Sequence, residues 1–256
     1  MMIDESGGYR GVFRHSNHLG YVLTILIYYL FAHKPFSVLI NYIVIIVLAG
    51  LLFFSKTSGA ILSFALLIFY NFIISQNISI KHKLFFIFGP LLLMVPIAFQ
   101  FSEKIIEQIN SLDYLDKNFI LQRVYTGNPG GYGSFIWRIV YWLQILFEFA
   151  KETFFNIFFG VGIDSLTKGN MPYRIMYTDP HNDFLKVLVE FGLVGLILFL
   201  NSIKNIFKMI NKNINILIII IIPLMFDNAI VNFSFVLTLM LLISYEYKII
   251  CSERSN

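Results

Sequence analysis

The stretch DPHNDFLKVLVEFGLVG, residues 179–195, combines a histidine, an amide and carboxylates with an apolar run. A neutral histidine can accept a proton as a general base. Asp179 is a favourable N-cap and Pro180 fits the first helical position, so we expect His181 in the first turn of a helix. The positive end of the helix dipole favours neutral imidazole there, and free N–H groups at that end can bind an anion such as phosphate. The alternative interpretation is a histidine that is simply solvated at a membrane boundary.

Glu190 lies deeper in the same stretch. In one continuous helix it would lie about 13 Å from His181 along the axis and on nearly the opposite face, so the two residues would not share a proton. A charge at the centre of a membrane helix costs about 2.5–3.5 kcal/mol, so Glu190 must face protein or a cavity. We expect a structural salt bridge to Lys186, four residues earlier. Gly192 and Gly195 would give the helix a smooth patch for close packing.

Two other segments carry cations beside apolar runs. RGVFRHSNHLG, residues 10–20, places two arginines, two histidines and an asparagine ahead of such a run. Its plain interpretation is a basic anchor at the membrane surface. SFIWRIVYWLQILFEF, residues 134–149, carries Arg138 and has apolar residues at helical spacing. Its plain interpretation is an amphipathic helix on the outer leaflet, where Tyr141 and Trp142 would suit the interface. A later Gly-x-Gly, residues 160–162, could bring backbone close to a ligand or form an ordinary turn.

The elements that must position these residues are membrane helices. Hydrophobic residues make up 57% of the 256 residues and charged residues 13%, and the mean hydropathy is +0.74. One soluble core of this size cannot hide so much apolar surface. A helix needs about 20 residues to cross about 30 Å of hydrocarbon. The expected spans are Leu19–Ala32, Phe36–Phe54, Gly59–Ile74, Leu84–Phe101, Phe184–Leu200, Ile214–Phe226 and Ala229–Tyr245.

We therefore predict an all-α integral membrane protein. It has about seven transmembrane helices and one large extracytoplasmic loop that contains short helices. The expected regions are 1–101, with an outward N-terminal segment and four helices, 102–183, the loop with the catalytic elements, and 184–256, with three helices and a cytoplasmic tail. The single cysteine, Cys251, excludes an internal disulfide and a cysteine metal cluster.

Topology follows from the basic residues of the short loops, which favour the cytoplasmic side. If the helices alternate, one side collects Lys34, Lys81, Lys83, Lys204, Lys208, Lys212, Lys248 and Arg254. The N-terminal segment, the turn at Lys56 and the long loop then face outward. The formal net charge of +4 is thus explained by topology, and we expect no nucleic-acid partner. Because the chain would begin outside without a cleavable signal pattern, we expect that upstream helices are missing.

Taken together, these motifs resemble a known family. The pattern H-N-x-x-L-x-x-L-x-E-x-G-x-x-G-L, residues 181–196, is similar to the signature of the O-antigen ligase and O-antigen polymerase superfamily. Residues 10–17 resemble its R-x-x-G-x-F-x-x-P-N segment, with Ser16 in the place of proline. Arg138 followed by residues 158–162 resembles its R-x(n)-P-L-x-G-x-G segment. The family's Ser-Arg-Gly element is matched by residues 55–59, SKTSG, with Lys56 as the cation.

The resemblance implies a membrane-bound, metal-independent glycosyltransferase without a cofactor. The donor would be a glycan on undecaprenyl diphosphate and the acceptor a sugar hydroxyl at the periplasmic or outer face of a bacterial cytoplasmic (inner) membrane. Further expected partners are membrane lipids, a chain-length regulator and a flippase. The roles implied are catalysis by His181, Arg138 and Arg10, substrate binding by Arg14, Asn17, Lys56 and Asn182, and structural support by Glu190, Lys186, Gly192 and Gly195.

Several functions stay open at this point. We favour a polymerase of lipid-linked oligosaccharide repeats, for O-antigen or for capsular or exopolysaccharide, because the loop over residues 102–183 is long. An O-antigen ligase, which transfers the glycan to the lipid A core, would need the same donor and base. A lipid-glycan flippase or other transporter should show repeats of broken helices around the bilayer midplane. A non-catalytic remnant is the remaining alternative.

Overall fold

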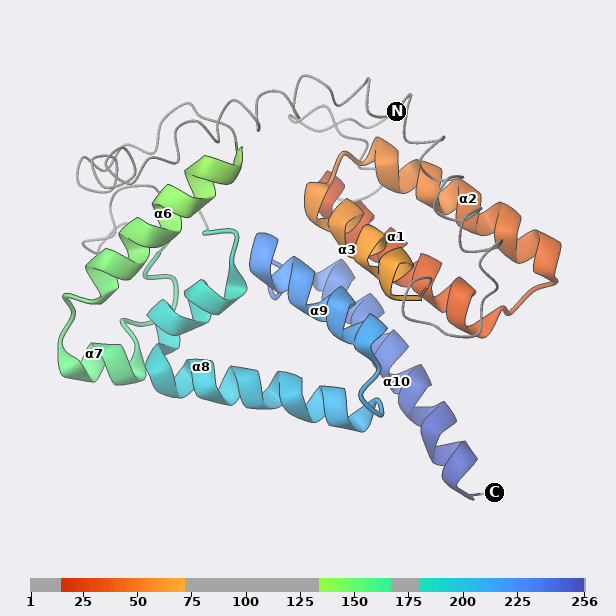
Figure 1. Cartoon of the computed structure of the whole chain (residues 1–256). Coiled ribbons are helices and arrows are strands. Elements are labelled where there is room, and N and C mark those ends of the chain that lie inside the picture. Colours follow the sequence, from red (N-terminus) through yellow and green to blue (C-terminus); the bar gives the residue numbers. More distant parts are fainter. Residues whose placement is uncertain (1–14, 72–133, 167–179, 256) are drawn as a thin grey trace. The chain divides into compact units, whose positions relative to one another are not determined.

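The computed structural model describes residues 15–71, 134–166 and 180–255, and every regular element in these ranges is a helix (Figure 1). The helices are α1 (Ser16–His33), α2 (Val38–Phe54), α3 (Ser58–Phe69), α6 (Ser134–Phe149), α7 (Phe154–Phe159), α8 (Asp183–Met209), α9 (Ile214–Phe226) and α10 (Phe233–Ser255). The predicted all-α class is therefore confirmed for the part of the chain that the structure describes.

The helix bounds follow the expected spans, with differences at the ends. α9 has the predicted bounds, whereas α8 continues past the predicted end at Leu200 to Met209. The helix continues because the sequence NSIKNIFKM contains no glycine or proline that would stop it. α10 begins at Phe233 rather than Ala229. The expected span Leu84–Phe101 lies outside the described residues.

One helix of the described ranges is both long and apolar enough to cross a membrane alone, over Phe233–Glu253. Three shorter apolar helices have between 10 and 17 residues, namely α2, α3 and α9. The number of spans and the large outer loop therefore stay predictions.

The chain divides into two compact units, residues 1–84 with 201–256, and residues 85–200. The first unit holds α1, α2, α3, α9 and α10, and α1 packs against each of the other four helices. The second unit holds α6, α7 and α8 as far as Leu200. The predicted regions 1–101, 102–183 and 184–256 stay predictions.

Small residues let α1 and α3 approach closely in the first unit (Figure 1). A Cβ atom added to Gly20 would lie 2.9 Å from the Cβ atoms of both Thr57 and Ala60. Thr24, one turn further along α1, donates its hydroxyl to the carbonyl oxygen of Gly20 in the same helix at 3.0 Å and lies 3.4 Å from the carbonyl oxygen of Ala60 on α3. Such contacts are typical of helix pairs in membranes, where small side chains and short hydrogen bonds replace the hydrophobic effect.

A buried polar network joins three helix ends of the first unit. The Glu246 Oε1 atom on α10 accepts the Tyr28 hydroxyl at 3.0 Å and lies 2.9 Å from His33 Nε2, both on α1. Asn213, which caps α9, donates its amide to the Tyr28 hydroxyl oxygen at 2.7 Å. Lys34, Lys212 and Lys248 each lie within two residues of a member of this network. The side of the membrane on which they lie stays a prediction, and Lys81 and Lys83 lie outside the described residues.

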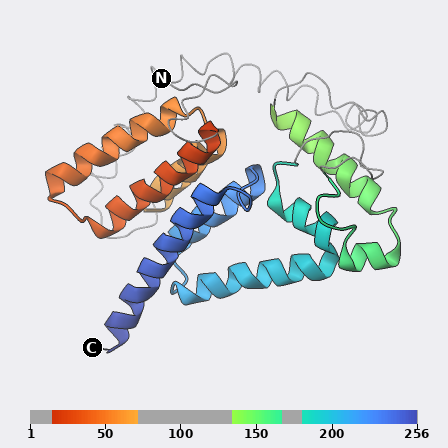
Figure 2. The same ribbon diagram turned by 180° about the vertical axis from the view of Figure 1, so that it is seen from behind.

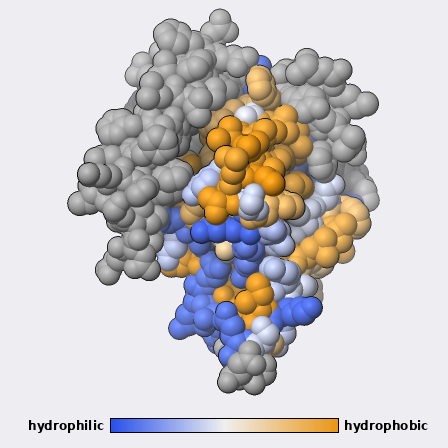
Figure 3. Space-filling model, turned by 90° about the vertical axis from the view of Figure 1, so that its right-hand side faces the viewer, coloured by the Kyte–Doolittle hydropathy of each residue, from blue (hydrophilic) through white to orange (hydrophobic). Residues whose placement is uncertain are grey.

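Apolar side chains cover one face of α2, which contains no charged residue. On the face drawn in Figure 3, hydrophobic residues gather in an upper patch, and hydrophilic residues predominate below it. The exposed apolar residues of α2 are Val38, Leu39, Ile40, Tyr42, Ile43, Ile46, Val47 and Phe54. An exposed surface of this kind is what a helix presents to lipid.

Candidate active site

His181 lies just before α8 and not in its first turn. The helix begins at Asp183, and the N-cap is Asn182, whose Oδ1 atom accepts the Leu185 N–H at 3.0 Å. The cap predicted at Asp179, with Pro180 at the first helical position, is therefore wrong. Aspartate and asparagine cap helices about equally well, so sequence alone could not choose between the two positions. Asp179 itself lies outside the described residues.

The backbone of His181 is in the left-handed region, with φ of 50°. Few residues other than glycine adopt this conformation, although histidine, asparagine and aspartate do so more often than most. The imidazole is part-buried and directly precedes the helix cap. The positive φ sets the direction in which the Cα–Cβ bond of His181 leaves the backbone.

The peptide group before His181 is anchored to α6. Trp142 donates its indole N–H to the carbonyl oxygen of Pro180 at 2.7 Å. Arg138 lies one helical turn before Trp142 on the same side of α6, because residues four apart are neighbours on a helix surface. The helix face that carries Arg138 is thus the face that holds the His181 loop. Arg138 itself is part-buried.

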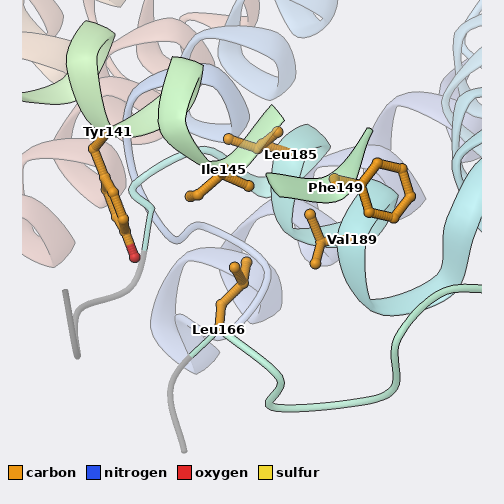
Figure 4. Packing of buried hydrophobic residues seen from close by; sticks show 6 residues of the cluster. All are labelled: Tyr141, Ile145, Phe149, Leu166, Leu185 and Val189. Carbon is orange, nitrogen blue, oxygen red and sulfur yellow. The ribbon is translucent and has the colours of Figure 1, made fainter. Parts of the chain in front are cut away.

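A hydrophobic core joins α6, α8 and the segment after α7 (Figure 4). α6 contributes residues at four-residue spacing, so that they form one stripe. The buried members of the cluster are Tyr141, Ile145, Phe149, Leu166, Leu185 and Val189. Tyr141 is 1% exposed and Trp142 bonds to Pro180, so both residues contact protein, and the position of α6 on the outer leaflet stays a prediction.

α8 is broken at Gly192, where φ is 70° and ψ is −169°. Helix carbonyls near such a break lose their usual partners four residues on and need other donors. The Val189 carbonyl accepts the Val161 N–H at 2.8 Å, and the Glu190 carbonyl accepts the Gly162 N–H at 3.2 Å. The Gly-x-Gly segment therefore packs its backbone against the broken helix.

Glycine is required on both sides of this contact. Gly160 has φ of 88°, and a Cβ atom there would overlap the backbone of Glu190 and Phe191. A Cβ atom on Gly192 would overlap the carbonyl group of Phe158. A Cβ atom on Gly195 would instead overlap the Phe191 side chain of the same helix. The neighbour that comes close to Gly192 is thus the 158–160 backbone.

Glu190 belongs to the same contact. Its side chain is 5% exposed, and Oε1 accepts the Asp164 N–H at 3.1 Å. Asp164 has φ of 63°, a turn conformation that this hydrogen bond stabilises. The carboxylate thereby ties the segment after α7 to the helix that follows His181. The salt bridge between Glu190 and Lys186 stays a prediction.

The other expected substrate-binding residues lie in the first unit or outside the described ranges. Asn17 lies in the first turn of α1, and Lys56 lies in the turn after α2 with φ of 54°. Because Gly20 approaches Thr57, the N-terminal end of α1 and this turn are neighbours. Arg10 and Arg14 lie outside the described residues.

Sequence reasoning missed two residues near His181, of which the first positions the loop. The first is Trp142, whose buried indole N–H needs an acceptor and finds it at Pro180. The second is Asp183, the first residue of α8, which is 0% exposed. An acidic residue in the first turn of a helix was a usable signal, because the helix dipole stabilises its charge. Asn182 was expected to bind substrate, but its oxygen caps α8, so its amide is the group left to bind a ligand.

Comparison with known proteins identifies a family. A family model described as O-antigen ligase matches residues 19–200, which include α1–α3, α6, α7, the His181 loop and the break in α8. No curated protein and no solved structure is significantly similar to the chain.

Proposed function

The chain belongs to the O-antigen ligase family, and on this basis we propose that it transfers a glycan from undecaprenyl diphosphate to a sugar hydroxyl. Membership implies glycan transfer of the O-antigen ligase or polymerase type, acting on lipid-linked glycans, and association with a membrane. The finer proposal is a multi-pass protein of a bacterial cytoplasmic membrane whose active face is periplasmic or extracellular.

In the proposed reaction His181 is the general base. Its imidazole takes the proton of the acceptor hydroxyl while the hydroxyl oxygen attacks the anomeric carbon of the donor. The bond from that carbon to the diphosphate oxygen breaks, and undecaprenyl diphosphate leaves with the electron pair. General-base catalysis typically contributes about 10²- to 10⁴-fold in rate. The observation that carries this assignment is the double anchoring of His181, by Trp142 on one side and by the Asn182 cap on the other.

Arginines are proposed to stabilise the leaving diphosphate. Negative charge accumulates on it as the anomeric bond breaks, and guanidinium groups can bind phosphate oxygens bidentately. Arg138 supports this role because it shares the α6 face that holds the His181 loop. Arg10 is the second proposed group, and Arg14, Asn17, Lys56 and the Asn182 amide would bind other parts of the substrates. No cofactor is part of the proposal.

We propose polymerisation of lipid-linked repeat units as the overall reaction, because the segment between the fourth and fifth expected spans is long. The second candidate is ligation to lipid A core, which the description of the matching family favours. The two reactions share the donor and the base and differ in the acceptor. A chain-length regulator and a flippase are partners that either reaction would be expected to use.

A reconstituted assay separates these candidates. The purified full chain in liposomes is given lipid-linked repeat units, with or without lipid A core. A ladder of longer lipid-linked products without core indicates a polymerase, and product formed only with core indicates a ligase. Movement of donor across the bilayer without consumption indicates a transporter, and no change of any kind indicates a remnant. The last two outcomes would overturn the proposed function.

A further inference from the structure

α7 exposes its aromatic residues instead of burying them. Within this six-residue helix Phe154, Phe155 and Phe159 are 77%, 66% and 56% exposed, and Ile163 shortly after it is 73% exposed. Phe155 and Phe159 lie one turn apart, with ring centroids 4.8 Å apart, so they form one ridge. We call these four residues the α7 wedge.

α7 and the segment after it are fixed to the core of the second unit. Ile157 and Val161 pack against the hydrophobic core of that unit. The Thr153 hydroxyl caps the helix by accepting the Asn156 N–H at 3.3 Å. A six-residue helix would not be stable alone in water. The wedge therefore projects from a helix that is held in place by its cap and by its contacts with the core.

The wedge is joined to α8 near Gly192, where the apolar side chains of that helix change from buried to exposed. Before Gly192, α8 packs Leu185 and Val189 into the core, as described above. After it, apolar side chains are exposed on more than one side, namely Leu193, Val194, Ile197, Leu198 and Leu200. An exposed helical segment of this kind is typical of one that faces lipid. The backbone hydrogen bonds of Val161 and Gly162 fix α7 beside the start of this segment, as both views show (Figures 1 and 2).

A cation precedes the wedge. Lys151 ends the turn after α6, and its side chain is 54% exposed. Its Nζ atom forms a salt bridge with Glu148 Oε1 at 2.7 Å and lies 4.1 Å from the centre of the Phe147 ring. Lysine beside aromatic residues is typical of membrane interfaces, where the ammonium group meets phosphate and the rings enter the acyl boundary.

We propose that the α7 wedge inserts into the outer leaflet of the membrane and fixes the height of the His181 loop above the lipid. Lipid is the proposed occupant because the exposed apolar surface of α7 continues directly into that of α8 after Gly192. Insertion is passed to the loop through α8, because the Glu190 carboxylate accepts the Asp164 N–H. Leu166, two residues after Asp164, packs in the core with Leu185 and Val189 of α8. The diphosphate of a lipid carrier lies at the membrane surface, which is the level at which the wedge would hold the loop.

The chain offers a direct test, because its single cysteine, Cys251, is exposed and can be replaced. In a Cys251→Ser background, an environment-sensitive fluorophore is attached to Phe155→Cys or Phe159→Cys, with Lys151→Cys as the control at the headgroup layer. The full chain is reconstituted in liposomes that carry nitroxides on the acyl chains. The wedge positions should be quenched at least about threefold more than position 151, and iodide in the water should show the reverse order.

Equal quenching of all three positions by acyl nitroxides would overturn the proposal. Protection of the wedge from iodide without quenching by lipid nitroxides would also overturn it, because a protein partner would then cover α7. This readout needs no glycan transfer, so it stands or falls independently of the proposed function.

A second arm tests the link to the active site and rests on the proposed function. The double variant Phe155→Ser with Phe159→Ser should lose at least about tenfold in transfer in liposomes, because serine cannot anchor in the acyl region. The matched variant Phe155→Leu with Phe159→Leu should retain activity. Equal activity of both variants would show that insertion does not set the height of the loop.

Discussion

Trp142 of α6 donates its indole N–H to the carbonyl oxygen of Pro180 at 2.7 Å, and Pro180 is the residue that precedes His181. The bond links two segments that lie 38 residues apart in the sequence. It fixes the backbone on one side of the histidine, while the Asn182 cap fixes it on the other. The proposed base is thus held by the two helices of the second unit that carry the family motifs.

Replacement of Trp142 by phenylalanine tests this anchoring. Phe keeps an aromatic ring but cannot donate a hydrogen bond, so the buried Pro180 carbonyl loses its partner at a cost of about 1–3 kcal/mol. We expect transfer to fall about tenfold while the amount of protein in the membrane stays the same. Turnover of lipid-linked donor by the reconstituted variant gives the measurement. Unchanged turnover would show that the bond does not position His181.

Glycines 160 and 192 should not tolerate a methyl group. Gly192→Ala would place a Cβ atom against the Phe158 carbonyl at a positive φ, and we expect at least about 2 kcal/mol of destabilisation. Gly160→Ala should behave alike, because its Cβ atom would overlap the Glu190 backbone. Thermal unfolding in detergent measures both. Gly50→Ala on α2 is the control, because nothing lies within 4 Å of its added Cβ atom, and a control as unstable as Gly192→Ala would contradict the account.

Two variants of Asn182 should separate its role as a helix cap from its proposed role in substrate binding. Asn182→Asp keeps the oxygen that caps α8 but loses the amide donor, whereas Asn182→Ala loses both. We expect the aspartate variant to unfold at the wild-type temperature and the alanine variant to be destabilised by about 1 kcal/mol. Both variants should lose activity, because the amide is proposed to bind substrate. A fully active aspartate variant would reduce Asn182 to a helix cap.

The proposed role of Arg138 in binding the diphosphate should require its guanidinium group. Arg138→Lys keeps the positive charge, but a point charge cannot reproduce bidentate binding of phosphate, so we expect most of the activity to be lost. Donor turnover is again the measurement. Membrane content and unfolding temperature should match those of the unsubstituted chain, which separates catalysis from folding. Full activity of the lysine variant would make Arg138 a surface anchor.

The sequence predicted the helices better than the turns between them. Apolar runs defined α9 and most of α2 because a buried or lipid-facing helix must be apolar along its length. The start of α8 was misplaced because Asp179 and Asn182 are both good caps and only tertiary contacts decide between them. The helix bounds could therefore be predicted where composition changes sharply and not where two local signals compete.

The sequence was sufficient to predict residues of the candidate site but not their geometry. His181 and Glu190 are visible because histidine and glutamate are unusual in apolar sequence. The break at Gly192 was not visible, because a glycine inside a membrane helix is more often a packing residue. The bonds from Val161 and Gly162 to the broken helix depend on that break, so they could not be predicted either.

The central claim is that His181 is the base for glycan transfer, and replacement of this one residue tests it most directly. His181→Ala in the full chain leaves the Trp142–Pro180 bond and the Asn182 cap to hold the loop. Glycan products are separated by length after expression of equal amounts of variant and unsubstituted protein in the membrane. We predict that the variant makes no long products. Polysaccharide of the same length and amount from the variant would contradict the account.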